Sequence, residues 1–170
     1  MAHIDMKLHT SDIFDADPDA SRICAIDFRN YGGRRTFYGP CLTLKVTEDH
    51  RHAFSLLEAP GAGRILVIDG GGPTRNALLG ATMASNALRH GWAGAIVFGC
   101  IRDSDQLADL DIGIKALGTT VRKASARMEG LLNVPVAFGS ALFTPGDWVY
   151  ADSDGVIVRS APFLPPCGTK

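Results

Sequence analysis

The sequence predicts an α/β domain with a βαβ unit at its centre and a β-rich C-terminal half. Two continuous apolar runs, residues 64–69 and 95–100, are typical of parallel strands that are buried on both faces. Between them, the apolar residues of 80–90 recur at helical spacing and form one stripe. After residue 134, short apolar segments alternate with turn signals. The strand, helix and parallel strand in the middle make a βαβ unit, whose crossover is almost always right-handed.

The N-terminal third of the chain predicts a helix, a strand and a second helix. Ser, Thr and Asp residues at the start of 10–17 favour a short helix. Within 38–46, side chains alternate with the period of a β-strand. The stretch 48–57 has the spacing of a helix, and the Pro-Gly-Ala-Gly sequence at 60–63 ends it.

The elements after residue 63 follow from apolar runs and from the Gly and Pro residues that separate them. The helix over 80–90 turns its apolar stripe inward, and Gly91 is suited to be its C-terminal cap. A short helix is expected over 104–110. The strands expected in the C-terminal half are 134–138, 141–143, 148–151 and 156–158.

The composition is that of a globular core with a balanced surface. The 170 residues suit one domain over 1–170, with flexible tails expected at about 1–9 and 160–170. Lys and Arg number 17 against 18 Asp and Glu, which argues against a broad basic surface for nucleic acid. No apolar run approaches the roughly 18–20 residues that span a bilayer, and the first residues lack the apolar core of a signal peptide. We therefore expect a soluble, cytoplasmic protein that contacts neither nucleic acid nor membrane.

The spacing of cysteine and histidine argues against a metal cage. The four cysteines have no C-x-x-C spacing and are expected to be free thiols, the last one exposed: Cys24, Cys41, Cys100 and Cys167. The five histidines form no metal-binding pattern. Two of them, His50 and His52, lie in a polar stretch and are expected to be solvated.

Two loops meet at one end of the βαβ unit, where ligands bind in open α/β sheets. The loop after Asp69 leads to a helix N-terminus, whose unpaired N–H groups favour a carboxylate or phosphate. The loop after Cys100 presents Arg102, which can hold a carboxylate bidentately, beside Asp103, a hard oxygen ligand for Mg²⁺ or Mn²⁺. Residues 70–72 lack the patterns of dinucleotide and ATP sites. These residues suit a small anion bound with a metal; an ordinary surface ion pair is the alternative.

Several motifs, in the same order and spanning about 10–158, resemble those of the RraA-like family. They are VIDGGG at 67–72, ALLG at 77–80, GWAG at 91–94, GCIRD at 99–103, DIGIKALG at 111–118 and PGDWVYAD at 145–152. This family contains the regulator of ribonuclease E activity A and the class II 4-hydroxy-4-methyl-2-oxoglutarate aldolases. The resemblance implies a compact α/β/β/α fold and a ring-shaped homotrimer with sites between subunits.

The resemblance also implies a role for each matching residue. Arg102 would bind substrate and steady the enolate oxygen as the catalytic residue, and Asp103 would hold the divalent cation, Mg²⁺ or Mn²⁺. The substrate carboxylate would accept hydrogen bonds from backbone N–H groups where the helix begins. Those groups belong to Gly80, Ala81, Thr82 and Met83.

Two positions depart from the pattern of the family's enzymes. Ala81 replaces an acid that holds and orients a metal-bound water, and Gln106 replaces a second acid. Retro-aldol cleavage needs a base to take the hydroxyl proton, whereas oxaloacetate loses carbon dioxide without a proton transfer. The substitutions are therefore expected to weaken aldol cleavage more than decarboxylation.

Two functions follow from the resemblance. The first is a metal-dependent lyase acting on pyruvate-derived 2-oxo acids, namely 4-hydroxy-4-methyl-2-oxoglutarate and oxaloacetate. The second is a non-catalytic regulator that binds ribonuclease E or an RNA helicase through the outer surface of the trimer. The basic segment 122–127 is a candidate for that surface, with a solvated loop as the alternative. The retention of Asp103 favours the lyase, because a protein-binding role has no evident need for it.

Overall fold

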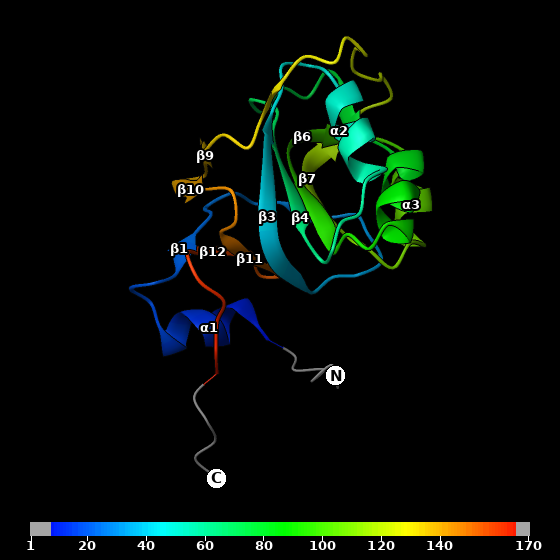
Figure 1. Cartoon of the computed structure of the whole chain (residues 1–170). Coiled ribbons are helices and arrows are strands. Elements are labelled where there is room, and N and C mark those ends of the chain that lie inside the picture. Colours follow the sequence, from blue (N-terminus) through cyan, green and yellow to red (C-terminus); the bar gives the residue numbers. More distant parts are fainter. Residues whose placement is uncertain (1–7, 166–170) are drawn as a thin grey trace.

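The computed structural model describes residues 8–165, and its elements follow one another as Figure 1 shows. The helices in this part of the chain are α1 (Thr10–Ala16), α2 (Arg51–Leu57), α3 (Ala81–Arg89) and α4 (Ser104–Ala108). The first strands are β1 (Arg22–Ile23), β2 (Arg29–Asn30), β3 (Phe37–Lys45), β4 (Ile65–Asp69), β5 (Ala77–Leu79) and β6 (Gly94–Ile101). They are followed by β7 (Gly113–Thr119), β8 (Leu131–Leu132), β9 (Val136–Phe138), β10 (Ala141–Phe143), β11 (Trp148–Ala151) and β12 (Val156–Arg159).

A parallel core of four strands, in the order β3-β4-β6-β7, forms the centre of the large sheet. β5 also runs parallel and pairs with the end of β6. The nine residues of β3 pair with three strands: 41–45 pair parallel with β4, 37–40 pair antiparallel with β11, and 44–45 pair antiparallel with β8. Through β3 the sheet therefore continues into the antiparallel strands β11, β12 and β1.

The sheets and helices stack in the order α/β/β/α. Figure 1 shows α2 and α3 on one side of the parallel strands and α1 at the opposite end of the molecule. Leu57 and Ala84 belong to the core cluster beneath α2 and α3, while Phe138 and Phe143 belong to the cluster on the other face of the sheet. Ile13 of α1 packs on the outer side of β11 and β12. The predicted α/β architecture is confirmed.

The predicted βαβ unit is β4, α3 and β6, and its boundaries agree with the sequence to within a residue or two. Gly91 follows α3 with a φ of +77°, so it caps this helix as predicted. β1, β2, β5, β7 and β8 were not predicted. The sequence of β7 does not have the continuous apolar run of a buried strand, because Lys115 interrupts it. That lysine is itself only 1% exposed.

The predicted free thiols are confirmed where the structure describes them. Cys24, Cys41 and Cys100 are buried and unbridged, while Cys167 lies outside the described residues. Burial raises the pKa of Cys24 to about 11 and that of Cys41 to about 12, so both thiols stay protonated at neutral pH. Of the expected tails, residues 1–7 and 166–170 also lie outside the described part. None of the described helices has the length and apolarity needed to cross a membrane.

Candidate active site

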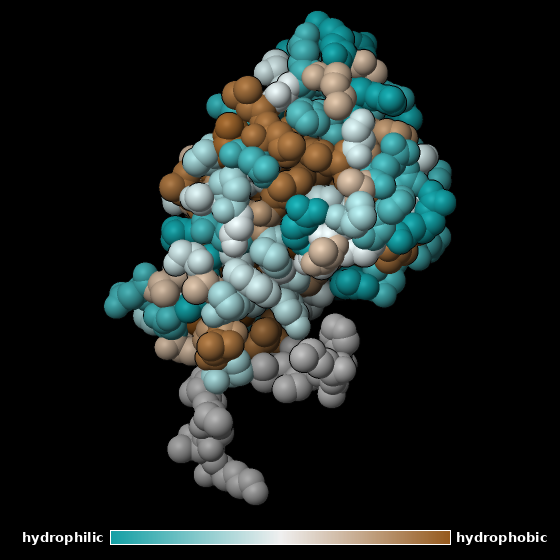
Figure 2. Space-filling model, viewed as in Figure 1, coloured by the Kyte–Doolittle hydropathy of each residue, from teal (hydrophilic) through white to brown (hydrophobic). Residues whose placement is uncertain are grey.

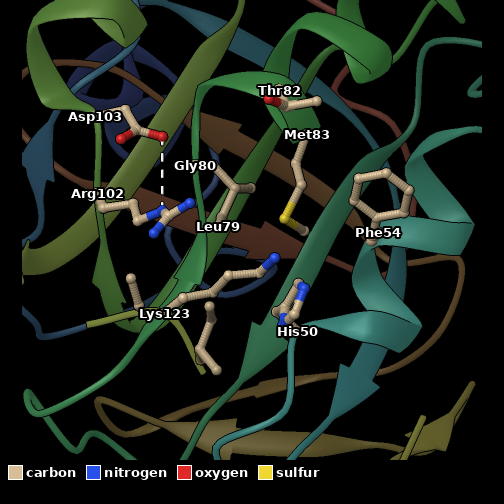
Figure 3. A pocket seen from close by; sticks show the side chains of 11 residues that line it. His50, Phe54, Leu79, Gly80, Thr82, Met83, Arg102, Asp103 and Lys123 are labelled. Carbon is tan, nitrogen blue, oxygen red and sulfur yellow. Dashed lines mark ion pairs between the residues drawn. The ribbon is translucent and has the colours of Figure 1, made fainter. Parts of the chain in front are cut away.

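A pocket of about 170 Å³ opens at the carboxyl ends of β5 and β6, beside the start of α3 (Figure 3). This is the end of the sheet at which the sequence placed the site. The pocket brings together five of the predicted residues: Gly80, Thr82, Met83, Arg102 and Asp103. Its remaining lining comes from His50, Phe54, Ala77, Leu78, Leu79 and Lys123.

Arg102 and Asp103 are presented by a sharp change of backbone direction at the end of β6. The Arg102 N–H donates to the Leu79 carbonyl at 3.0 Å, which ties the ends of β5 and β6 together. Asp103 has a φ of +61°, a left-handed conformation that Asp tolerates better than most residues. The Arg102 Nε lies 3.7 Å from the Asp103 Oδ2, and their side chains are 39% and 33% exposed. An ion pair so exposed is weak, so both groups remain available to a ligand.

Gly80 is required where the start of α3 approaches Asp103. A Cβ at Gly80 would lie 2.7 Å from the Asp103 Oδ2, which is closer than real contacts allow. The Ala81 N–H donates to the same oxygen at 3.1 Å. Because Asp103 already accepts this bond, the first-turn N–H groups left for a substrate carboxylate are those after Ala81. Thr82 and Met83, which carry them, line the pocket.

The two residues that depart from the enzyme pattern lie together, outside the pocket. Ala81 and Gln106 line a neighbouring hollow of about 320 Å³ between α3 and α4, and Thr82 borders both spaces. Ala81 itself is 8% exposed. The missing acid therefore removes charge from the hollow beside Asp103 and leaves the pocket wall unchanged.

Lys123 is the pocket residue whose position only long-range pairing explains. The Ala77 N–H donates to the Arg122 carbonyl at 2.7 Å, and the Ala124 N–H donates to the Ala77 carbonyl at 3.0 Å. These bonds hold the segment around Lys123 along β5, and Figure 3 shows the lysine side chain reaching into the pocket. The basic run at 122–127 was visible in the sequence, but its contact with β5 was not.

His50 corrects the expectation that this histidine is solvated. It is 5% exposed, because the segment 124–125 folds over it. Its Nδ1 lies 2.7 Å from the Ser125 carbonyl oxygen and 3.1 Å from that of Ala124. The polar neighbours of His50 suggested exposure in the sequence, and only the tertiary contact with 124–125 reverses this.

Asp49 is fully buried beside His50 and holds the same segment in place. Its carboxylate accepts hydrogen bonds from the Arg127 N–H at 2.6 Å, the Arg51 N–H at 2.9 Å and the Ser125 hydroxyl at 3.1 Å. Burial by itself would raise the pKa of Asp49, but these donors outweigh it and hold the pKa below the ordinary value of 3.8. Asp49 is therefore ionised at neutral pH and fastens the chain that carries Lys123.

The donor set of the pocket fits a hydrated hard cation and does not fit a protein cage. Within residues 8–165, no group of three or more His, Cys, Asp or Glu side chains converges as metal ligands. Asp103 is the carboxylate that lines the pocket. Mg²⁺ commonly keeps several waters and takes only one or two carboxylates, whereas a structural zinc site needs four protein ligands.

The sequence matches a known family and curated relatives over most of its length. The model of the RraA-like family, described as Aldolase/RraA, matches residues 10–158. A protein of Ectopseudomonas mendocina (strain ymp) is 46% identical over 153 residues, covering 90% of this chain and 94% of that protein. One of Azotobacter vinelandii (strain DJ / ATCC BAA-1303) is 44% identical over 161 residues, covering 95% and 99%. Both are named "Putative 4-hydroxy-4-methyl-2-oxoglutarate aldolase".

Two solved structures share the fold closely. A protein of Geobacillus kaustophilus HTA426, described as an S-adenosylmethionine:2-dimethylmenaquinone methyltransferase, superposes with a TM-score of 0.91 at 40% identity. The comparison covers 95% of this chain and 100% of that one. The RNA-processing inhibitor RraA from Thermus thermophilis gives 0.90 at 36% identity, covering 94% and 97%. Proteins described by three different activities share this architecture, so the site has to decide the function.

Proposed function

Because the chain belongs to the RraA-like family, we propose that it is a divalent-metal-dependent lyase acting on pyruvate-derived 2-oxo acids. The proposed substrates are 4-hydroxy-4-methyl-2-oxoglutarate, by aldol cleavage, and oxaloacetate, by decarboxylation. The observation that carries the proposal is the convergence of two cationic side chains, a carboxylate and a helix N-terminus in one pocket. Such a pocket suits a small anion that gains negative charge as it reacts.

Arg102 and Lys123 supply the positive charge that the reaction needs. The Arg102 guanidinium would hold the substrate and then the pyruvate enolate oxygen, where charge develops when the carbon–carbon bond breaks. The N–H groups of Thr82 and Met83 would donate hydrogen bonds to the carboxylate of the substrate at the start of α3. Phe54 and Leu79 give the pocket an apolar side that limits access of water.

Asp103 would hold Mg²⁺ or Mn²⁺ through a carboxylate oxygen, and its bond from the Ala81 N–H fixes that carboxylate in place. When bound, the cation would supply a Lewis acid for the 2-oxo group and its carboxylate. The remaining coordination positions belong to water and substrate, so we expect weak binding of the metal without a 2-oxo acid and tighter binding with one. An Asp103→Ala variant that binds oxalate and Mg²⁺ as tightly as the parent would refute this assignment.

A direct assay of oxaloacetate decarboxylation tests the proposed function. The purified protein should accelerate release of carbon dioxide in the presence of Mg²⁺ and lose this activity when the metal is chelated. Free Mg²⁺ promotes the reaction by itself, so a heat-denatured sample at the same Mg²⁺ concentration is the control. A parent protein no faster than that control with both substrates would overturn the lyase proposal.

We propose that the protein assembles as a homotrimer. Several large apolar side chains are exposed, and Figure 2 shows apolar surface gathered in the upper half of one face. The exposed large apolar side chains include Met128, Leu131, Leu132 and Leu142, which are between 37% and 60% exposed. Contiguous apolar surface of this kind commonly marks a protein interface. Light scattering should give a mass near three times 18.1 kDa.

A regulator that binds ribonuclease E or an RNA helicase is the second candidate function. The observation that favours it is the likeness to RraA from Thermus thermophilis over nearly the whole of both chains. This function would use the outer surface and would not require the residues of the pocket. A binding measurement with a purified ribonuclease E, comparing the parent and Arg102→Ala, separates the two: equal binding by both proteins supports a regulator.

A further inference from the structure

We propose that His50 is the proton-transfer residue of the pocket: its Nε2 takes the hydroxyl proton of an aldol substrate and returns it to the enolate. This inference rests on the proposed lyase function and concerns a step that function leaves without an acid–base group. Ala81 and Gln106 stand where the resemblance implies acids, and Asp103 is assigned to the metal. Among the residues that line the pocket, His50 is the one histidine.

The hydrogen bonds of His50 fix which ring nitrogen faces the reaction. Both neighbours of its Nδ1 are backbone carbonyl oxygens, those of Ala124 and Ser125, and a carbonyl oxygen can only accept. Nδ1 must therefore carry a hydrogen in the neutral ring as well as in the cation. In the neutral ring Nε2 is then unprotonated, which is the form required of a base.

The ring is held rigidly at the wall of the pocket. His50 precedes α2 directly, and its own N–H donates to the Ser125 carbonyl at 2.9 Å, so the residue is bound to this segment twice. In the view of Figure 3 the imidazole lies below Met83, across the pocket from Arg102 and Asp103. A substrate held by Arg102 would therefore present its other end towards His50.

Charged side chains of both signs lie near His50. Lys123 reaches in from the segment along β5, and Asp49 precedes His50 in the chain. Across the pocket stands the pair Arg102–Asp103 at the end of β6. α3 and β5 contribute only uncharged residues to the lining.

His50 alone accounts for both proton transfers of aldol cleavage. Nε2 takes the proton of the C4 hydroxyl, the C3–C4 bond breaks, and its electron pair forms the pyruvate enolate as C4 becomes a carbonyl. The imidazolium then gives the same proton to C3, which becomes the methyl group of pyruvate. In decarboxylation of oxaloacetate the C3–C4 bond breaks with loss of carbon dioxide and without a base. Only the protonation of C3 then involves His50, and the ring takes that proton from solvent.

Exchange of the methyl protons of pyruvate isolates the proposed proton transfer from bond cleavage. In D₂O with Mg²⁺, the parent should replace the C3 protons of pyruvate by deuterium. The loss of the methyl signal in the ¹H NMR spectrum measures this exchange. In His50→Asn the amide Nδ2 lies where Nδ1 was, so the bonds to the Ala124 and Ser125 carbonyls can persist while Nε2 is lost. We expect exchange to fall by about 10²-fold or more.

Two further variants separate proton transfer from structure. His52→Asn changes a neighbouring histidine that does not line the pocket and should exchange like the parent. His50→Gln places an amide nitrogen where Nε2 was and should also be inactive in exchange, so the test survives if His50→Asn fails to fold. For each variant, the melting temperature and the mass in solution establish that the native assembly is present.

The outcomes distinguish this inference from the function on which it rests. A parent that neither decarboxylates nor exchanges overturns the lyase proposal itself. If the parent decarboxylates oxaloacetate, the lyase proposal stands, and two results would overturn the role of His50 alone. One is exchange at the parental rate in His50→Asn, and the other is no exchange in the parent. Loss of exchange in Lys123→Met but not in folded His50→Asn would also overturn this role and would assign the proton transfer to the lysine.

Discussion

The two walls of the pocket were built in different ways. One wall, made of Gly80, Arg102 and Asp103, comes from short stretches that end two neighbouring strands, and its geometry is local. The other wall, made of His50 and Lys123, is assembled from segments more than 70 residues apart that meet along β5. A motif search therefore finds the first wall and misses the second, although both face the same space.

The largest effect is expected on the first wall, from Arg102→Ala. Removing the guanidinium takes away the group that faces developing negative charge, and we expect kcat/KM for oxaloacetate decarboxylation to fall by about 10²–10³. The matched control is Arg34→Ala, which breaks an exposed Arg–Asp pair with Asp111 away from the pocket. Steady-state kinetics at saturating Mg²⁺ checks this, and equal losses in the two variants would contradict a local role.

The next effect is a gain, from Ala81→Asp in the hollow beside the first wall. A carboxylate in the first turn of α3 is favoured by the helix dipole, so stability should change little. It would restore an anchor for a water that serves in proton transfer, a role often worth about 10²–10⁴ in rate. Since His50 is proposed to serve aldol cleavage in the parent, we expect a gain at the lower end of this range, about 10²-fold for aldol cleavage and only a few-fold for decarboxylation.

The control for this gain is Ser85→Asp, which adds the same charge one turn later in the same hollow. If both reactions rise equally in Ala81→Asp, the acid acts through metal binding. If the parent already cleaves the aldol substrate as fast as the variant, a residue present in the parent supplies the base, and the exchange experiment tests whether that residue is His50.

A smaller effect is expected from Gly80→Ala, which tests how closely the first wall is built. The added methyl group would meet the Asp103 Oδ2 at 2.7 Å and the Arg102 Cγ at 3.3 Å, so both side chains must shift. Displacement of this order should lower kcat/KM about tenfold or more. Gly155→Ala, whose Cβ would meet nothing within 4 Å, should leave kinetics unchanged.

The smallest catalytic effect should come from Asp49→Asn, which loosens the second wall without touching the pocket. Weakening the charge-assisted bonds to the segment of Lys123 should cost about 1–3 kcal/mol of unfolding free energy and a few-fold in activity. Since the pKa of Asp49 is lowered in the folded state, its stabilisation is present above 3.8 and is lost as pH falls through the folded-state pKa.

Denaturant unfolding at several pH values checks this expectation. The gap in stability between the parent and Asp49→Asn should be widest at neutral pH and should narrow below pH 3.8. Asp111→Asn, which removes an exposed carboxylate bound to Arg34, is the control and should cost much less. A gap that is constant across this range would contradict the ionised state assigned to Asp49.

Local patterns in the amino-acid sequence are enough to specify the elements whose residues act locally. Apolar runs specify β4 and β6, and a helical stripe ending at Gly91 specifies α3. The start of α3 and the end of β6 bring Gly80 and Arg102 to one edge of the sheet. The features that depend on contacts between distant segments follow only from the tertiary structure. β5 has only three residues, too few to show a periodicity, and Lys115 interrupts the apolar run of β7. Yet β5 positions Lys123, through the backbone hydrogen bonds that Ala77 forms with Arg122 and Ala124. His50 likewise has polar neighbours in the chain but becomes buried because the carbonyls of 124–125 fold onto its ring, and such backbone acceptors leave no trace in the amino-acid sequence.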